Sequence, residues 1–296
     1  MFPFGRPTAM SLTATRVFSS NPPLDLTLES AFFSRLKMRN GTFKFTKPSR
    51  FAEVDRWLLP FAKDRIGADS AVLDIAASTA LTTIELMDAL AVQGMSPRRV
   101  IATDLFIDAH LVDVAPGIRV LCDPDGWPLH YELAGFGIRA WRRRLDLITL
   151  AAVPLMLARA GLGPRLRRLI AEGRSHPVRM QSRALSGRNI ELVANDIFVR
   201  EPRFVGAFDF IRAANILNLG YFDERRLRTA IANIRAYCRE PGALVLIVRT
   251  GDAHHDGTLF ELDRSGGFSV VARLGRGAEI EPLVLQGNVK RAGCCE

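Results

Sequence analysis

Acidic side chains lie within or just after three apolar runs of this sequence. Asp74 lies in the first run, Asp104 ends the second, and Asp196 follows the third. Short apolar runs are typical of buried strands, and an open parallel sheet binds ligands beyond the carboxyl ends of its strands. Asp104 could then accept hydrogen bonds from two ribose hydroxyls, and Asp196 could accept one from the exocyclic amine of an adenine. The acids therefore predict a pocket for an adenosine-containing cofactor.

Small residues follow the first run, where a strand is expected to turn into a helix that starts at about Thr82. These residues are Ala76, Ala77, Ser78, Thr79 and Ala80. Small side chains let a ligand lie against the backbone, with the N-terminus of the helix behind it. The glycine fingerprint of pyrophosphate-binding loops is absent, so a cofactor without a pyrophosphate fits this loop better.

Polar residues also follow the fourth and fifth apolar runs, where an acceptor substrate would meet the pocket. His254 and His255 come after the run at residues 244–248, and Asn215 comes after the run that opens at residue 208. A histidine could act there as the general base for a protonated nucleophile, and Asn215 could contact the acceptor. For the histidine segment, a polar surface loop is the favoured interpretation and a general base the alternative. Because two adjacent histidine side chains diverge, we predict no metal site.

Apolar runs alternate with helical stripes along much of the chain. A helix is expected after Asp223, for example, with Leu227, Ile231 and Ile234 on one side. The last two strands are expected to be antiparallel. The pattern predicts an α/β fold, with a doubly wound, mostly parallel seven-stranded sheet and helices on both faces.

The interval between the second and third strands is too long for a simple β-helix-β step, which needs only ~30 residues. We therefore predict a helical cap inserted at residues 105–189. The cofactor-binding core would comprise residues 71–104 and 190–296. A loose lead-in at residues 1–28 and a helical segment at residues 29–70, which packs on the core, would precede it.

Positive charge is concentrated in the predicted insertion. The chain has 40 Lys and Arg against 31 Asp and Glu, and residues 139–188 hold twelve Arg against two acids. The apolar stretch at residues 147–158 is too short to cross a bilayer, which takes ~20 residues. Three interpretations stay open: a lid helix with solvated arginines, a helix that dips into an anionic membrane surface, and a nucleic-acid site. The last is less favoured, because the aromatic residues of the segment precede the main Arg run and do not alternate with it.

The order of these segments resembles the class I S-adenosylmethionine-dependent methyltransferases, whose core is Rossmann-like. The matching pieces are residues 72–86, 101–104, 193–197, 208–222 and 237–244. The resemblance implies S-adenosylmethionine as the cofactor. The candidate cofactor-binding residues are Asp74, Ala76, Ala77, Ser78, Thr79, Ala80, Asp104, Leu105, Asn195, Asp196, Ile197 and Ala214. The family usually carries glycines where this chain has Ala76, Ser78 and Ala80; alanine is tolerated where φ is negative, although its methyl group could crowd the cofactor.

The function implied is methyl transfer to an unidentified acceptor, with an apolar or lipid-like small molecule as one expectation. Two alternatives stay open: a non-catalytic protein of this fold that binds a membrane surface or partner through its basic insertion, and an RNA methyltransferase. A composition of 48% hydrophobic and 24% charged residues excludes a disordered chain, a collagen-like repeat and a coiled-coil rod. Four cysteines without a C-x-x-C pair, and an opening without a signal-peptide pattern, favour a cytoplasmic protein, with peripheral attachment to a membrane as an option.

Overall fold

The computed structural model describes residues 12–21, 24–141, 152–251 and 254–286, and the side chains of residues 152–160 are not described. The chain divides into two compact units. The first unit comprises residues 1–48 and 106–184, and the second comprises residues 49–105 and 185–296.

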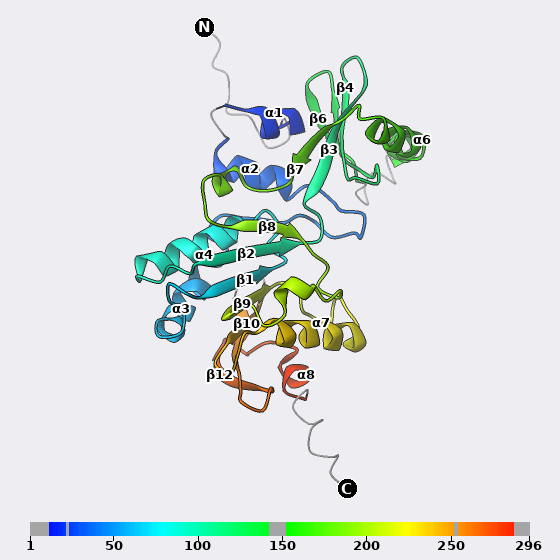
Figure 1. The fold of residues 1–296 in the computed structure, drawn as a ribbon. Helices are drawn as coiled ribbons and strands as arrows, with labels where there is room; N and C mark the ends of the chain where they lie inside the picture. Colours follow the sequence, from blue (N-terminus) through cyan, green and yellow to red (C-terminus); the bar gives the residue numbers. More distant parts are fainter. Residues whose placement is uncertain (1–11, 22–23, 142–151, 252–253, 287–296) are drawn as a thin grey trace. The chain divides into compact units, whose positions relative to one another are not determined.

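The second unit is built on a seven-stranded sheet in the order β12-β11-β10-β9-β1-β2-β8 (Figure 1). The strands are β1 (Ala71–Ile75), β2 (Arg99–Asp104), β8 (Glu191–Ala194), β9 (Phe210–Ala214), β10 (Leu244–Thr250), β11 (His255–Leu262) and β12 (Phe268–Leu274). Neighbours from β8 to β10 pair in parallel, whereas β11 is antiparallel to both β10 and β12. The predicted mixed α/β architecture with a mostly parallel seven-stranded sheet is thus confirmed.

Helices cover both faces of this sheet. Helices α3 (Ala52–Ala62) and α4 (Leu81–Val92) pack on one face, and α7 (Glu224–Tyr237) and α8 (Glu281–Gln286) pack on the other. Alternate residues of β1 serve the two cores, since Val72 lies in one and Leu73 in the other. Strands buried on both faces are apolar throughout, which is why these runs could be recognised in the sequence.

Helix α7 has the boundaries that its sequence predicts. The side chain of Asp223 caps its N-terminus by accepting the Arg226 backbone N–H at 2.8 Å. Leu227, Ile231 and Ile234 recur at helical spacing and are all buried against the sheet. Two short 3-10 turns, η1 (Arg183–Leu185) and η2 (Pro202–Phe204), complete the connections on either side of β8.

The first unit contains a five-stranded antiparallel sheet in the order β6-β5-β4-β3-β7. Its strands are β3 (Asp108–Ala115), β4 (Ile118–Cys122), β5 (Pro128–Leu133), β6 (Phe136–Arg139) and β7 (His176–Arg179). Helices α1 (Ala14–Ser19) and α2 (Leu26–Phe33) pack on one face, and α6 (Ala152–Ala171) packs on the other. The unit therefore has two small cores, one on each side of its sheet.

The expectation of a purely helical cap is wrong, because the insertion supplies all five strands of this antiparallel sheet beside the long helix α6. In β3 the buried residues change sides midway, with Ala109 and Leu111 in one core and Val112 and Val114 in the other, so the polar–apolar alternation shifts phase within the strand. Hairpin turns at Gly117 and Gly135, both at positive φ, were the available signal. The lead-in contains helix α1, and the expected helical segment at residues 29–70 is divided between the two units. Of the apolar stretch, residues 147–151 lie outside the described residues.

None of the helices in the described part of the chain combines the length and apolarity needed to cross a membrane.

Candidate functional site

The loop after β1 adopts a left-handed backbone at three residues that are not glycine. The φ angles are 60° at Ala76, 56° at Ser78 and 63° at Ala80. This conformation costs an L-residue roughly 1–2 kcal/mol, because Cβ comes too close to the following carbonyl oxygen. The expectation that these positions tolerate alanine through a negative φ is therefore wrong. The loop retains the backbone of a glycine-rich turn without the glycines.

Backbone hydrogen bonds hold this strained loop against β2. The Ala77 N–H donates to the Thr103 carbonyl oxygen at 2.9 Å, and the Ser78 N–H donates to Asp104 Oδ2 at 2.9 Å. The Ala80 N–H closes the turn on the Ala77 carbonyl oxygen. Asp104 is therefore tied to the loop that the sequence predicts as its partner in a cofactor pocket.

The five loop side chains divide into an inward and an outward group. Ala77, Thr79 and Ala80 are buried, and the Ala80 side chain has no exposed surface, so its methyl group lies in the interior and not in the crevice. Ala76 and Ser78 are half-buried. The hydroxyl oxygen of Ser78 is shielded from solvent and has no hydrogen-bond partner among the described residues. Of the five residues, only Ala76 and Ser78 are partly exposed, and the hydroxyl oxygen of Ser78 is itself covered.

The ends of β2 and β8 lie side by side. Asp104 is in register with Ala194, and the Asn195 N–H donates to the Asp104 carbonyl oxygen at 3.1 Å. Asp196 Oδ1 accepts the Phe198 N–H at 3.0 Å, so this carboxylate braces its own loop. The structure therefore brings Ser78, Asp104 and Asn195 together. Asp196, by contrast, forms a hydrogen bond within its own loop.

The remaining candidate cofactor-binding residues differ in exposure. Leu105 is exposed, Ile197 is buried, and Ala214 is half-buried at the end of β9.

Asp74 lies in the interior and not at the crevice. Its carboxylate accepts hydrogen bonds from Arg212 Nε at 2.9 Å and Nη2 at 2.6 Å, and a third from Thr83 Oγ1 at 2.5 Å. Arg212 is its partner in the register of β1 and β9, and its Nη1 also donates to Asp55 at 3.1 Å. All three charged groups are buried. Asp74 therefore belongs to a structural ion network, and we do not propose it as a cofactor ligand.

Burial within this network changes the protonation of Asp55. Loss of solvent raises the pKa of Asp55 to about 6, against the opposing charge of Arg212. For Arg212, burial alone would lower the pKa, but the charges of Asp74 and Asp55 outweigh it and raise the pKa. The guanidinium therefore stays charged and Asp55 is the group that titrates. A charged residue inside the apolar run at residues 210–214 was the sequence signal for this network.

The structure joins two of the three candidate catalytic residues through Thr250. Asn215, at φ 59°, accepts the Thr250 N–H with Oδ1 at 2.6 Å and donates from Nδ2 to Thr250 Oγ1 at 3.3 Å. Thr250 Oγ1 lies 3.1 Å from His255 Nδ1. The three residues come from the ends of β9 and β10 and the start of β11. Thr250 is not among the predicted site residues, because a threonine at the end of a strand has no distinctive pattern in the sequence.

The His255 imidazole is half-buried beside Thr250. Burial lowers the pKa of its imidazole, and the charge of Arg50 adds to this effect against the opposing charge of Glu53. The ring is therefore neutral at pH 7. Phe51 packs against it with ring centroids 6.0 Å apart, and the Arg50 guanidinium lies over the same Phe51 ring. Phe51 also belongs to the core between α3 and the sheet.

His254 differs from its neighbour. Its side chain is 58% exposed, and its Nε2 lies 3.5 Å from Asp256 Oδ2. That carboxylate already binds Arg276, whose Nη2 is 2.7 Å away. The expected divergence of the two side chains leaves His255 facing inward and His254 facing solvent.

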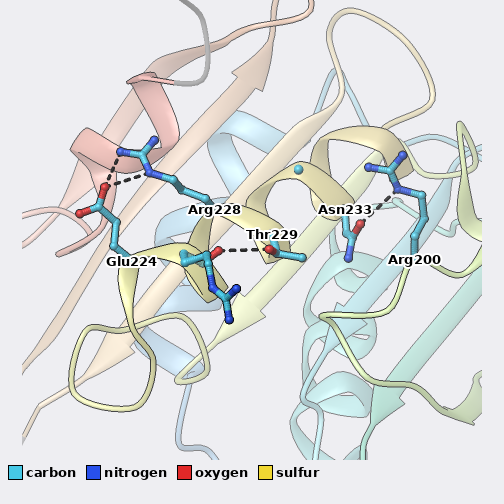
Figure 2. Close-up of a pocket in the computed structure, with 7 residues that line it drawn as sticks. Arg200, Glu224, Arg228, Thr229 and Asn233 are labelled. Atoms are coloured by element: carbon cyan, nitrogen blue, oxygen red, sulfur yellow. Dashed lines mark hydrogen bonds and ion pairs between the residues drawn. The ribbon is translucent and has the colours of Figure 1, made fainter.

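A separate pocket of about 670 Å³ lies on the outer face of α7 (Figure 2). Arg228 pairs there with Glu224, Thr229 donates to the Arg225 carbonyl oxygen, and Arg200 donates to Asn233. None of the predicted site residues lines this pocket. In the described part of the chain, no three His, Cys, Asp or Glu side chains gather as a metal site requires.

Comparison with known proteins gives a distant likeness of fold. No protein-family model matches the sequence, and no curated protein matches it. Among solved structures, a SAM-dependent methyltransferase from Aquifex aeolicus is similar at 12% identity and a TM-score of 0.31, covering 69% of this chain and 68% of that one. Geranyl diphosphate C-methyltransferase from Streptomyces coelicolor A3(2) is similar at 11% identity and a TM-score of 0.30, covering 68% and 46%. The chain spans about half the length of several structures it matches.

Proposed function

We propose that this chain is an S-adenosylmethionine-dependent methyltransferase. One observation carries the proposal: the loop after the central strand β1 keeps a glycine-type backbone without glycines and is bonded through Ser78 to Asp104 at the end of β2. Backbone strain of this kind persists where the surrounding structure enforces it, and it clusters at ligand sites. The scores of the structural comparisons lie too low to add to this argument.

The residues at the carboxyl ends of β1, β2 and β8 fit the cofactor. The shielded Ser78 hydroxyl has no partner among the described residues, and the methyl group of Ala80 is turned into the interior. Helix α4 begins directly after this loop, and its N-cap residue Ala80 provides no side-chain cap. Asp104 and Asn195 would hold the nucleoside, and the backbone of the loop at residues 76–78 would lie against it. When bound, the cofactor supplies an electrophilic methyl group.

The chain itself would orient the acceptor and remove its proton. Aligning a nucleophile with a reactive carbon removes much of the entropic barrier of the reaction. A hydroxyl or amine acceptor would give its proton to the neutral imidazole of His255. Thr250 and Asn215 would fix the ring through Nδ1, which leaves Nε2 for the acceptor. His255 is thus the proposed general base and Asn215 a positioning residue.

Replacing Asp104 with alanine tests the cofactor site. We expect titration calorimetry with S-adenosylhomocysteine to show at least a hundred-fold loss of affinity in Asp104→Ala. Asp88→Ala is the matched control, because Asp88 lies on α4 in the same unit and pairs only at the surface with Arg188. Asp196→Ala should reduce the affinity less than Asp104→Ala, since the Asp196 carboxylate already accepts a hydrogen bond from its own loop. Equal affinity of the wild-type and Asp104→Ala proteins would defeat the assignment.

Turnover separates this proposal from the non-catalytic alternative. Affinity for the cofactor without methylation of any acceptor would favour a protein that only binds. An apolar or lipid-like acceptor, and a cytoplasmic protein with peripheral membrane attachment, stay predictions from the sequence.

A further inference from the structure

An extended segment of the first unit exposes its aromatic side chains and buries its polar ones. Phe43 and Phe45 are 42% and 47% exposed, whereas Lys44 and Thr46 are 3% and 6% exposed. A half-buried strand normally shows the opposite pattern. The arrangement of residues 42–47 therefore points to a use for the outward aromatic rings.

Hydrogen bonds fix this inverted orientation. The ammonium of Lys44 donates to the Phe106 carbonyl oxygen at 2.5 Å, and its backbone N–H donates to the Leu36 carbonyl oxygen. The Thr46 N–H donates to the hydroxyl of Ser34, which in turn donates to the Thr46 carbonyl oxygen. With Lys44 and Thr46 held inside, alternation of side chains along the segment places Phe43, Phe45 and Lys47 outside.

Residues distant in the sequence extend the aromatic row. The ring of Trp141 lies 5.1 Å from that of Phe43, centroid to centroid, and its indole N–H donates to the Arg35 carbonyl oxygen at 2.8 Å. Lys37 Nζ lies 5.5 Å from the centroid of Phe43, and Arg139 Cζ lies 5.7 Å from that of Trp141. We name Lys37, Phe43, Phe45, Lys47, Arg139 and Trp141 the aromatic–basic surface.

The charge of the two units identifies the sign of the partner. The first unit carries 19 Lys and Arg against nine Asp and Glu, and the second carries 21 against 22. The whole positive excess of the chain therefore belongs to the unit that bears the aromatic–basic surface. A polyanion is the complementary partner.

We propose that the aromatic–basic surface binds single-stranded nucleic acid. Bases stack on aromatic rings whatever their sequence, while Lys and Arg contact the phosphates between them. Phe43 and Phe45 are two residues apart in an extended segment, a spacing of roughly 6.6–6.8 Å that suits successive unstacked bases. The fold brings Phe43 beside Trp141 and Arg139, at the start of the basic segment, although they are about a hundred positions apart in the sequence. This inference concerns binding and is independent of the methyl-transfer proposal.

Fluorescence anisotropy of the full chain with a labelled 12-nucleotide oligouridylate tests the proposal, and the matching oligothymidylate shows whether the sugar matters. We expect Phe43→Ala/Phe45→Ala to weaken binding at least ten-fold with an unchanged salt slope, since each lost stack weakens binding several-fold or more. Phe136→Ala is the matched control, because this phenylalanine is also exposed, lies in the same unit and should change affinity less than two-fold.

Replacing the lysines should instead change the salt dependence of binding. Lys37→Gln/Lys47→Gln should make the slope of log affinity against log salt less negative by about 1.4, because each phosphate contact contributes about 0.7. Unchanged circular dichroism spectra and melting temperatures would verify that the variants fold.

Three results would overturn the proposal: no saturable binding to either oligonucleotide at 100 mM salt, equal binding by wild type and Phe43→Ala/Phe45→Ala, or an equal loss in Phe136→Ala. Co-sedimentation with vesicles of phosphatidylcholine and phosphatidylserine tests the alternative that this surface binds a membrane. Loss of vesicle binding in Phe43→Ala/Phe45→Ala, with oligonucleotide binding intact, would assign the surface to a membrane.

Discussion

Replacing Ser78 with glycine should stabilise the second unit, because two unfavourable features of the loop disappear together. The left-handed backbone at φ 56° costs a serine roughly 1–2 kcal/mol. Its shielded hydroxyl has no partner among the described residues, and such a group costs about 1–3 kcal/mol. Glycine offsets part of this gain by about 0.5–1 kcal/mol through the larger entropy of the unfolded chain. We expect the free energy of unfolding to rise by at least about 1 kcal/mol.

Two neighbouring alanines provide matched comparisons for Ser78→Gly. Ala80→Gly relieves the same backbone strain but removes a fully buried methyl group, worth about 0.8 kcal/mol, so the net change should be near zero. Ala77 is buried and is not at positive φ, so Ala77→Gly loses the methyl group and adds chain entropy without relieving strain. It should destabilise the unit by about 1–2 kcal/mol.

Urea unfolding at 25 °C, followed by the fluorescence of Trp57, measures these differences. Trp57 lies on α3 in the second unit, whereas Trp127 and Trp141 lie in the first and can be replaced with phenylalanine. The slope of the free energy against urea should stay constant, so shifts of the midpoint report stability. If Ser78→Gly were no more stable than Ala77→Gly, the loop would not be strained and the argument for a ligand-shaped turn would fail.

Three further predictions concern the interior and the proposed base. Arg212→Met should destabilise the unit by about 3–5 kcal/mol in urea unfolding, because it leaves buried carboxylates without their cation; Arg249→Met, at an exposed ion pair, should cost less than about 1 kcal/mol. Because the folded-state pKa of Asp55 is raised to about 6, its contribution to stability is present below pH 4 and is lost as the pH rises through 6. Asp55→Asn should abolish this decrease in the free energy of unfolding, measured from pH 4 to 7.5. Once an acceptor is found, the methylation rate should rise with pH through a pKa below 6.5 and level off by pH 7. His255→Gln should lower the rate about a hundred-fold and remove this pH dependence. An unaltered pH profile in His255→Gln would exclude His255 as the base.

Local pattern was sufficient to identify the parallel core. Each of its elements shows its pattern within a few consecutive residues, as in the apolar runs of β1, β2 and β10 and the stripe of α7. The reason is that burial on both faces of a strand, or on one face of a helix, repeats at a fixed spacing. The antiparallel pair β11 and β12 followed from the same kind of evidence. The sheet of the first unit could not be identified in this way, because the alternation in β3 changes phase within the strand and the charge of the insertion suggested exposed helices.

The candidate site could be predicted only as far as strand ends. The sequence by itself determined that Asp104, Asn195 and the loop at residues 76–80 would meet at one edge, because parallel strands end on the same side of a sheet. Only the tertiary structure decided that Asp74 pairs with Arg212, that His255 rather than His254 turns inward, and that Trp141 joins Phe43. Each of these depends on which segments become neighbours across the fold, and spacing along the chain carries no information about contacts between residues about a hundred positions apart.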